Sequence, residues 1–119
     1  MAALQYTNLG PPAFITAAVA AIYTNPGSTS TYIRGIIFHN TDTAVRTITV
    51  YEVPNSGGVV GTYAASEEFF KYALQPGETI VFEITAGPGI TLTALNDTIQ
   101  AICDVTNKVT AKFIGAIYA

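Results

Sequence analysis

The chain has 119 residues and a mass of 12.5 kDa, the size of a single domain. Its formal net charge is −3, only 11% of its residues are charged, and 50% are hydrophobic. This balance argues against nucleic acid as a partner, because phosphate binding requires clustered lysines and arginines. Such low charge also predicts that part of the surface contacts another protein chain.

The first twelve residues, MAALQYTNLGPP, are predicted to form an N-terminal arm, residues 1–12, ahead of one β-sandwich domain, residues 13–119. The arm is polar and lacks a strand or helix pattern. Its apolar side chains therefore have no local strand to pack on, and they are candidates for contact with a partner protein: Leu4, Tyr6 and Leu9. A frayed terminus is the alternative.

The next segment, residues 13–23, reads AFITAAVAAIY. A membrane-spanning helix needs about 20 residues, so this segment is too short, and no basic residue precedes it as in a signal peptide. Neither a membrane partner nor export by its own signal is expected. Alanine favours a helix here, whereas the β-branched and aromatic residues favour a strand. The strand is the preferred interpretation, and the helix is the alternative.

Turn signals recur along the rest of the chain, at residues 24–30, 39–43, 53–58, 75–78, 86–89, 95–97 and 106–108. Between them lie runs rich in Ile, Val, Thr, Tyr and Phe. This spacing predicts an all-β fold, an antiparallel β-sandwich of jelly-roll type with short hairpin connections.

The run TYIRGIIFHN is predicted to be one of these strands. Strict alternation would put Arg34 and Ile36 on one face, and Ile33 and Gly35 on the other. Gly35 would then allow close approach of a neighbouring backbone. Arg34 is expected to form a cross-strand ion pair with Glu52 or with another strand carboxylate, and contact with a neighbouring subunit is the alternative.

Catalytic and metal-binding candidates are few. His39 is the sole histidine and lies where a predicted strand becomes a polar turn, which favours a half-exposed structural role. Cys103 is the sole cysteine, and its strand context predicts a buried, unreactive thiol. These two residues supply neither a Ser-His-acid triad nor a structural zinc site, so no enzyme activity and no cofactor are expected. Calcium stays an alternative, with carboxylates in turns as ligands: Asp42, Asp97 and Asp104.

The glutamates offer little support for glycoside hydrolysis, which requires paired carboxylates in a cleft. Glu67 and Glu68 are adjacent, so on a strand they would point to opposite faces. Glu52 and Glu83 could face each other across strands, but a solvated outer face explains both residues more simply.

The uncharged run PNSGGVVGTYAAS, residues 54–66, is predicted to be a mobile or contact-making loop. Its apolar side chains complete the set of candidate partner contacts: Val59, Val60 and Tyr63. Of the two segments, the N-terminal arm is the preferred one for partner binding. At its end, Ser66 and the two glutamates that follow favour one helical turn. The run FFKYAL after them favours a strand.

Three later runs, residues 78–86, 97–105 and 108–118, alternate with the period of two that is typical of half-buried strands. In the first of them, Ile80, Phe82 and Ile84 are predicted to lie on one face of the strand, and Val81 on the other. The last run has a second face that is only half polar, which predicts a central strand or one covered by another subunit.

Three segments combine these strand and turn motifs: YTNPGSTSTYIRGIIFHNTDTAVRTITVYEVPNSGG, LQPGETIVFE and LNDTIQAICDVTNKVTAKFIGA. Together, over about residues 22–117, they resemble small β-rich virion structural proteins of tailed bacteriophages. The shared motifs are strand and turn patterns rather than catalytic signatures. By this resemblance, the expected roles are a head decoration (cement) protein, a neck or tail component, or a fibre-associated domain.

The resemblance implies a non-enzymatic capsid decoration protein, located in the virion after assembly in the host cytoplasm. Its expected partners are the phage major capsid protein or other virion proteins, and copies of itself. A homotrimer is preferred, because cement proteins usually sit on local threefold axes. The alternative is a glycan- or receptor-binding sandwich module that uses exposed aromatic rings, although a core role is favoured for most of them: Tyr51, Tyr63, Phe69, Phe70 and Tyr72.

Overall fold

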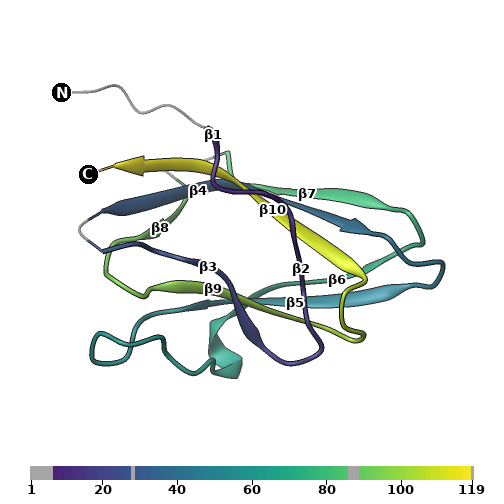
Figure 1. Cartoon of the computed structure of the whole chain (residues 1–119), viewed down its shortest axis with the longest axis horizontal. Helices are drawn as coiled ribbons and strands as arrows, with labels where there is room; N and C mark the ends of the chain where they lie inside the picture. Colours follow the sequence, from purple (N-terminus) through teal and green to yellow (C-terminus); the bar gives the residue numbers. More distant parts are fainter. Residues whose placement is uncertain (1–6, 28, 86–88, 119) are drawn as a thin grey trace.

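A computed structural model of the chain describes residues 7–27, 29–85 and 89–118. These residues form ten β-strands and one 3-10 turn, and Figure 1 shows the strands in two layers. All strand pairs are antiparallel. The predicted all-β antiparallel sandwich is therefore confirmed.

The first sheet has the strand order β1-β10-β4-β7, and the described residues add β2 beside β10 and β8 beside β4. Its long central strands are β10 and β4, as predicted for the last strand of the chain. The bounds in this sheet are β1 (Thr7–Asn8), β2 (Ala13–Phe14), β4 (Ser30–Asn40), β7 (Thr79–Glu83), β8 (Ile90–Leu92) and β10 (Val109–Tyr118).

The second sheet has the strand order β3-β9-β5-β6. A 3-10 turn, η1, lies between β5 and β6, and it matches the helical turn predicted before a strand. The bounds here are β3 (Ala20–Thr24), β5 (Arg46–Val53), η1 (Ala65–Glu67), β6 (Glu68–Leu74) and β9 (Thr98–Cys103).

Most short connections cross from one sheet to the other, which corrects the prediction of hairpins. β4 belongs to the first sheet, whereas β5, the next strand of the chain, belongs to the second. Within the described residues, β5 and β6 are the consecutive strands that pair with each other. Arg34 and Glu52 are therefore not cross-strand neighbours. Instead, Arg34 Nη2 donates to the carbonyl oxygen of Thr85 at 3.5 Å.

Residues 13–23 do not form one strand, contrary to the prediction. β2 pairs with β10 in the first sheet, and β3 pairs with β9 in the second. Between them, the chain crosses from one layer to the other (Figure 1). Ile15 anchors this crossing, because its N–H donates to Val109 O and its carbonyl accepts from Asn107 N–H. The side chain of Ile15 is fully buried and closes one side of the core.

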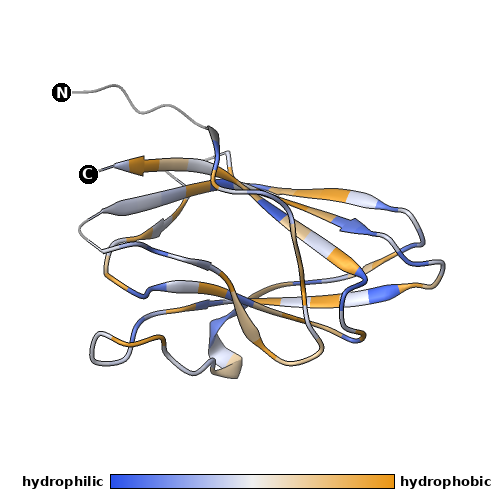
Figure 2. Ribbon diagram, in the orientation of Figure 1, coloured by the Kyte–Doolittle hydropathy of each residue, from blue (hydrophilic) through white to orange (hydrophobic). Residues whose placement is uncertain are grey.

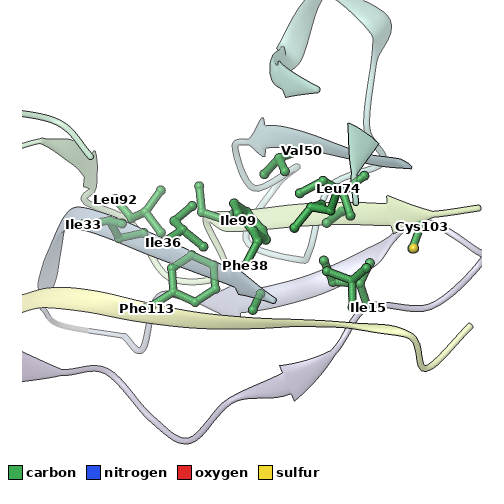
Figure 3. Packing of buried hydrophobic residues seen from close by; sticks show 14 residues of the cluster. Ile15, Ile33, Ile36, Phe38, Val50, Leu74, Leu92, Ile99, Cys103 and Phe113 are labelled. Atoms are coloured by element: carbon green, nitrogen blue, oxygen red, sulfur yellow. The ribbon is translucent and has the colours of Figure 1, made fainter. Parts of the chain in front are cut away.

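The hydrophobic core lies between the two sheets. Figure 3 shows side chains that meet from both layers, with Ile33, Ile36, Phe38 and Phe113 from the first sheet and Val50, Leu74, Ile99 and Cys103 from the second. Burial of each large aliphatic or aromatic side chain stabilises the fold by about 1.5–3 kcal/mol. On β7 the predicted alternation is confirmed, since Ile80 and Phe82 are half-buried against the core while Val81 is exposed.

A β-bulge in β4 reverses the faces predicted for its second half. Consecutive residues of β10 pair with Gly35 and with Ile33, so Arg34 is the extra residue on β4. Because of this extra residue, Ile33 and Ile36 both point into the core, although strict alternation puts them on opposite faces.

The close backbone approach predicted at Gly35 occurs instead at Gly115 on β10. A Cβ at Gly115 would clash with the carbonyl oxygen of Tyr32. A Cβ at Gly35 would lie 3.6 Å from Phe82 O, which is ordinary contact. The bulge therefore depends on glycine at position 115.

Candidate functional site

The predicted contact residues of the arm have different outcomes. Leu4 and Tyr6 lie outside the described residues. Leu9 is half-buried against the core, and its N–H donates to Phe113 O at 3.0 Å. Together with the pairing of β1 on β10, this makes Leu9 part of the sandwich edge, unlike the predicted side chain with no strand to pack on.

The long loop between β5 and η1 presents the remaining predicted contact residues to solvent. Val59, Val60 and Tyr63 are 62%, 46% and 44% exposed. Figure 2 shows an orange stretch in this loop, which lies at the same end of the long axis as the C-terminal end of β10 (Figure 1). We call this end of the sandwich the tip, and the loop between β5 and η1 the tip loop. Among the described residues, its exposed large apolar side chains are Val59, Val60, Tyr63, Leu95, Ile117 and Tyr118.

A network of hydrogen bonds around the partly buried side chain of Asp97 holds the loop at the tip. One carboxylate oxygen of Asp97 accepts hydrogen bonds from the N–H and the side-chain amide of Asn55, both at 2.9 Å. The other oxygen accepts from the N–H groups of Ala94 at 3.0 Å and Thr93 at 3.3 Å. Partial burial raises the pKa of Asp97, but these hydrogen bonds outweigh burial and lower the pKa below its usual value.

Two side chains outside the loop bind its backbone. Asn96 Nδ2 donates to Gly58 O, and Gln100 Nε2 donates to Gly61 O, each at 2.9 Å. The loop is thus attached to the β8–β9 connection and to β9. The sequence indicated a turn at residues 95–97 but carried no signal that this turn would bind a loop about forty positions earlier.

Most of the aromatic residues considered for sugar stacking belong to or pack against the core, as predicted. Phe70 lies 4.8 Å from Phe82 and 5.8 Å from Phe38 between ring centroids, and all three belong to or pack against the core. Tyr51 is buried and lies 4.9 Å from the exposed ring of Tyr63. The ring of Tyr63 therefore packs against Tyr51 and is also exposed to solvent, where a partner can contact it.

A groove of about 590 Å³ opens beside the tip, between the β6 edge of one sheet and the β7 and β8 edge of the other. Its lining combines apolar and acidic side chains, including Phe69, Phe82, Ile90, Glu52, Glu67 and Glu68. Glu67 and Glu68 both line it, although a continuous strand would have separated them, because Glu67 belongs to η1 and Glu68 begins β6. The sequence placed no site here, since the three glutamates come from different elements.

The groove carboxylates have distinct surroundings. Burial raises the pKa of Glu52, and the nearby charge of Asp97 adds to this effect. Glu67 Oε1 accepts a hydrogen bond from Ala64 N–H at 2.8 Å, which caps the start of η1. Burial raises the pKa of the Tyr51 phenol, and the negative charge of Glu68 raises it further. Negative charge is therefore concentrated where Glu52, Glu67 and Glu68 line the groove.

Comparison with known proteins assigns no family to this chain. No protein-family model matches it, and no curated protein is significantly similar to it. In the described part of the chain, no helix has the length and apolar character needed to cross a membrane.

The two residues considered for catalysis lie on different sheets. His39 on β4 is half-buried, and its Nδ1 is 2.7 Å from Thr79 Oγ1. Cys103 on β9 is buried, as predicted, and its thiol donates to Asp104 Oδ1 at 3.4 Å. Burial raises the pKa of this thiol, which disfavours the reactive thiolate.

The aspartates considered for calcium have protein partners. Arg46 binds Asp42 at 2.7 Å and Asp104 at 3.6 Å, whereas Asp97 organises the tip. Within residues 7–27, 29–85 and 89–118, no three or more His, Cys, Asp or Glu side chains are grouped so that they could hold a metal ion.

Proposed function

We propose that this protein is a non-enzymatic structural protein of a tailed-phage particle, and that it is a capsid decoration (cement) protein that stabilises the head. The observation that carries the proposal is the tip, where a hydrogen-bonded loop keeps Val59, Val60 and Tyr63 exposed. Apolar groups that are already ordered gain free energy by burial against another protein and lose little entropy on docking.

The phage part of the proposal is supported by the resemblance of residues 22–117 to small virion proteins. Its partners are the major capsid protein or other virion proteins, and its location is the virion, assembled in the host cytoplasm. A neck, tail or fibre-associated position is the alternative within the same particle.

The proposal includes a homotrimer and a jelly-roll connectivity. A closed ring keeps an assembly bounded, whereas an open head-to-tail contact would form fibres. The strand order supports the jelly roll: if β1 with β2, and β7 with β8, each count as one interrupted strand, two sheets of four remain. Successive strands then alternate between these sheets except at β5 and β6.

The test is attachment to phage capsids that lack this protein. A variant with Val59→Ser, Val60→Ser and Tyr63→Ser removes the apolar surface of the tip loop. The matched control is Val45→Ser, Val81→Ser and Tyr72→Ser, which changes the same residue types at exposed positions elsewhere.

We expect the tip variant to lose attachment, with affinity reduced by about 100-fold or more, because interface energy concentrates in a few apolar and aromatic anchors. The control variant should attach like the wild type. Full attachment of the tip variant, or absence of the protein from purified particles, would refute the proposal.

A glycan-binding module is the second candidate function, and the exposed Tyr63 ring supported by Tyr51 is the observation that favours it. An aromatic face open to solvent can stack on the apolar face of a sugar ring. Saturable glycan binding that Tyr63→Ala abolishes, combined with absence from purified capsids, would favour this candidate over the decoration protein.

A further inference from the structure

We propose that the groove between β6 and the β7 and β8 edge docks an apolar segment of a partner protein that carries a lysine or arginine side chain. The groove and its acidic lining are distinct from the exposed apolar loop that carries the proposed function. The inference does not depend on the partner being a capsid protein, so it goes beyond that function.

The apolar part of the lining fits the stem of such a side chain. The groove volume of about 590 Å³ lies within the range of about 300–1,000 Å³ that is usual for binding sites. The rings of Phe69 and Phe82 are 5.5 Å apart, tilted, and half-buried, so they remain partly accessible from the groove. A methylene stem can pack on these rings, and a cationic head gains further energy near an aromatic face.

The acidic part of the lining selects a cation. Glu52 at the end of β5 and Glu68 at the start of β6 approach the groove from neighbouring strands, and its described lining contains no lysine or arginine. Glu67 already accepts a hydrogen bond from Ala64 N–H, so Glu52 and Glu68 are the carboxylates assigned to the incoming charge. A cation there would also reduce the unfavourable interaction between the charges of Glu52 and Asp97.

The same geometry favours a protein segment over a free cation. The lining is both apolar and acidic, and a small cation would use the carboxylates alone. Pro54 and Ser66, which also line the groove, lie just before and just after the part of the chain that carries Val59, Val60 and Tyr63. A protein segment, unlike a free cation, can contact both the groove and this loop.

Titration of the full-length, ¹⁵N-labelled protein with short peptides tests the proposal. The probe is acetyl-Gly-Val-Lys-Val-Gly-amide, and its matched control replaces lysine with norleucine, which keeps the stem and removes the charge. Butylammonium is the free-cation control. We expect saturable shifts of the Glu68, Phe69 and Ile90 amides with the lysine peptide, at a dissociation constant of about 1 mM. The norleucine peptide should bind about tenfold more weakly, and high salt should weaken the lysine peptide as well.

Substitutions in the groove provide the second readout. Glu52→Gln and Glu68→Gln should each weaken the lysine peptide about five- to tenfold and leave the norleucine peptide unaffected. Glu83→Gln, on an exposed residue of β7 outside the lining, should change neither. The amide spectrum of each variant reports whether it is folded.

Three results would overturn the inference: no saturable shifts at the groove, equal affinity for the lysine and norleucine peptides, or butylammonium binding as tight as that of the lysine peptide. No capsid takes part in this experiment, and the variant that tests capsid attachment leaves Glu52 and Glu68 intact. Failure of peptide docking is therefore distinguishable from failure of the proposed function.

Discussion

Asp97 accepts two hydrogen bonds from Asn55, a residue 42 positions earlier in the chain, through the backbone N–H and the side-chain amide. This contact joins the start of the tip loop to the connection between β8 and β9. It converts an uncharged, glycine-rich loop into a surface with a defined position.

Replacement of Asp97 by alanine should release the tip loop. Loss of hydrogen bonds to a charged group should lower the free energy of unfolding by about 2 kcal/mol. Amide hydrogen exchange should also accelerate at Asn55 and Ala94, whose N–H groups lose their acceptor. Glu83→Ala, at an exposed position on β7, is the control and should stay within about 0.5 kcal/mol of the wild type. Unchanged exchange in the Asp97 variant would contradict this role.

The stability of the protein should fall in acid because of Asp42 and Asp97. The Thr43 N–H, and then Arg46, lower the pKa of Asp42 below its usual 3.8, and the pKa of Asp97 is lowered as well. Groups with a lowered pKa in the folded state stabilise it above the unfolded pKa, and this contribution is lost as the pH falls through the folded pKa.

The measurement is urea unfolding as a function of pH from about 7 down to about 2.5. In the double variant Asp42→Asn and Asp97→Asn, the free energy of unfolding should depend less steeply on pH below about 4 than in the wild type. An equally steep acid dependence in that variant would show that other carboxyls cause it.

Glu52→Gln should stabilise the folded protein at about pH 7, and the gain should vanish well below pH 4.5. Burial and then the charge of Asp97 raise the pKa of Glu52, so ionisation of this carboxyl opposes folding. Thermal unfolding at the two pH values measures the effect, with Glu83→Gln as the control. A Glu52→Gln variant less stable than the wild type at about pH 7 would contradict the prediction that ionisation of Glu52 opposes folding. Greater stability combined with weaker peptide docking would mark Glu52 as a residue retained for binding.

Gly115→Ala should destabilise the protein by about 3 kcal/mol, because the new methyl group would displace the backbone of β4 at Tyr32. Gly35→Ala is a matched substitution in the facing strand, where the added Cβ makes ordinary contacts, and should cost less than about 1 kcal/mol. Chemical denaturation of both variants provides the comparison. Equal destabilisation would show that the bulge tolerates a side chain at position 115.

Light scattering on the full chain should give three times the monomer mass of 12.5 kDa. Self-association is expected because a charge-poor surface gains free energy when it is buried against copies of itself in a closed ring. The number three is what the resemblance to cement proteins implies. Cross-linking of the protein on phage particles measures the same oligomeric state in the presence of the capsid. A monomer in both measurements would contradict the expected trimer.

The faces of regular strands were predictable from the sequence because alternation is a local property. Each residue of an extended strand points opposite to its neighbour, so Ile80 and Phe82 could be assigned to one face without knowing their partners, and both pack against the core. The same rule failed at Ile36, where one extra residue in β4 shifts the alternation. That shift is set by pairing with β10, which is far away in the chain.

The partner of each strand was not predictable from local pattern. β4 and β5 follow each other across a short polar turn, which favours a hairpin, yet they lie in different sheets. A sandwich buries both strands by placing them on opposite sides of the core, and the free energy gained depends on all the strands together. Residues 13–23 are divided between the two sheets for the same reason.

By itself, the sequence determined the all-β class, the low charge and the exposure of the loop that contains Val59, Val60 and Tyr63, because these follow from composition and from turn residues close together in the chain. Only the tertiary structure decided that Asp97 holds this loop and that Glu52 and Glu68 share a groove with Phe82. Those residues come from different strands and connections. Their proximity arises from the packing of two sheets, whose free energy is a sum over contacts between distant parts of the chain.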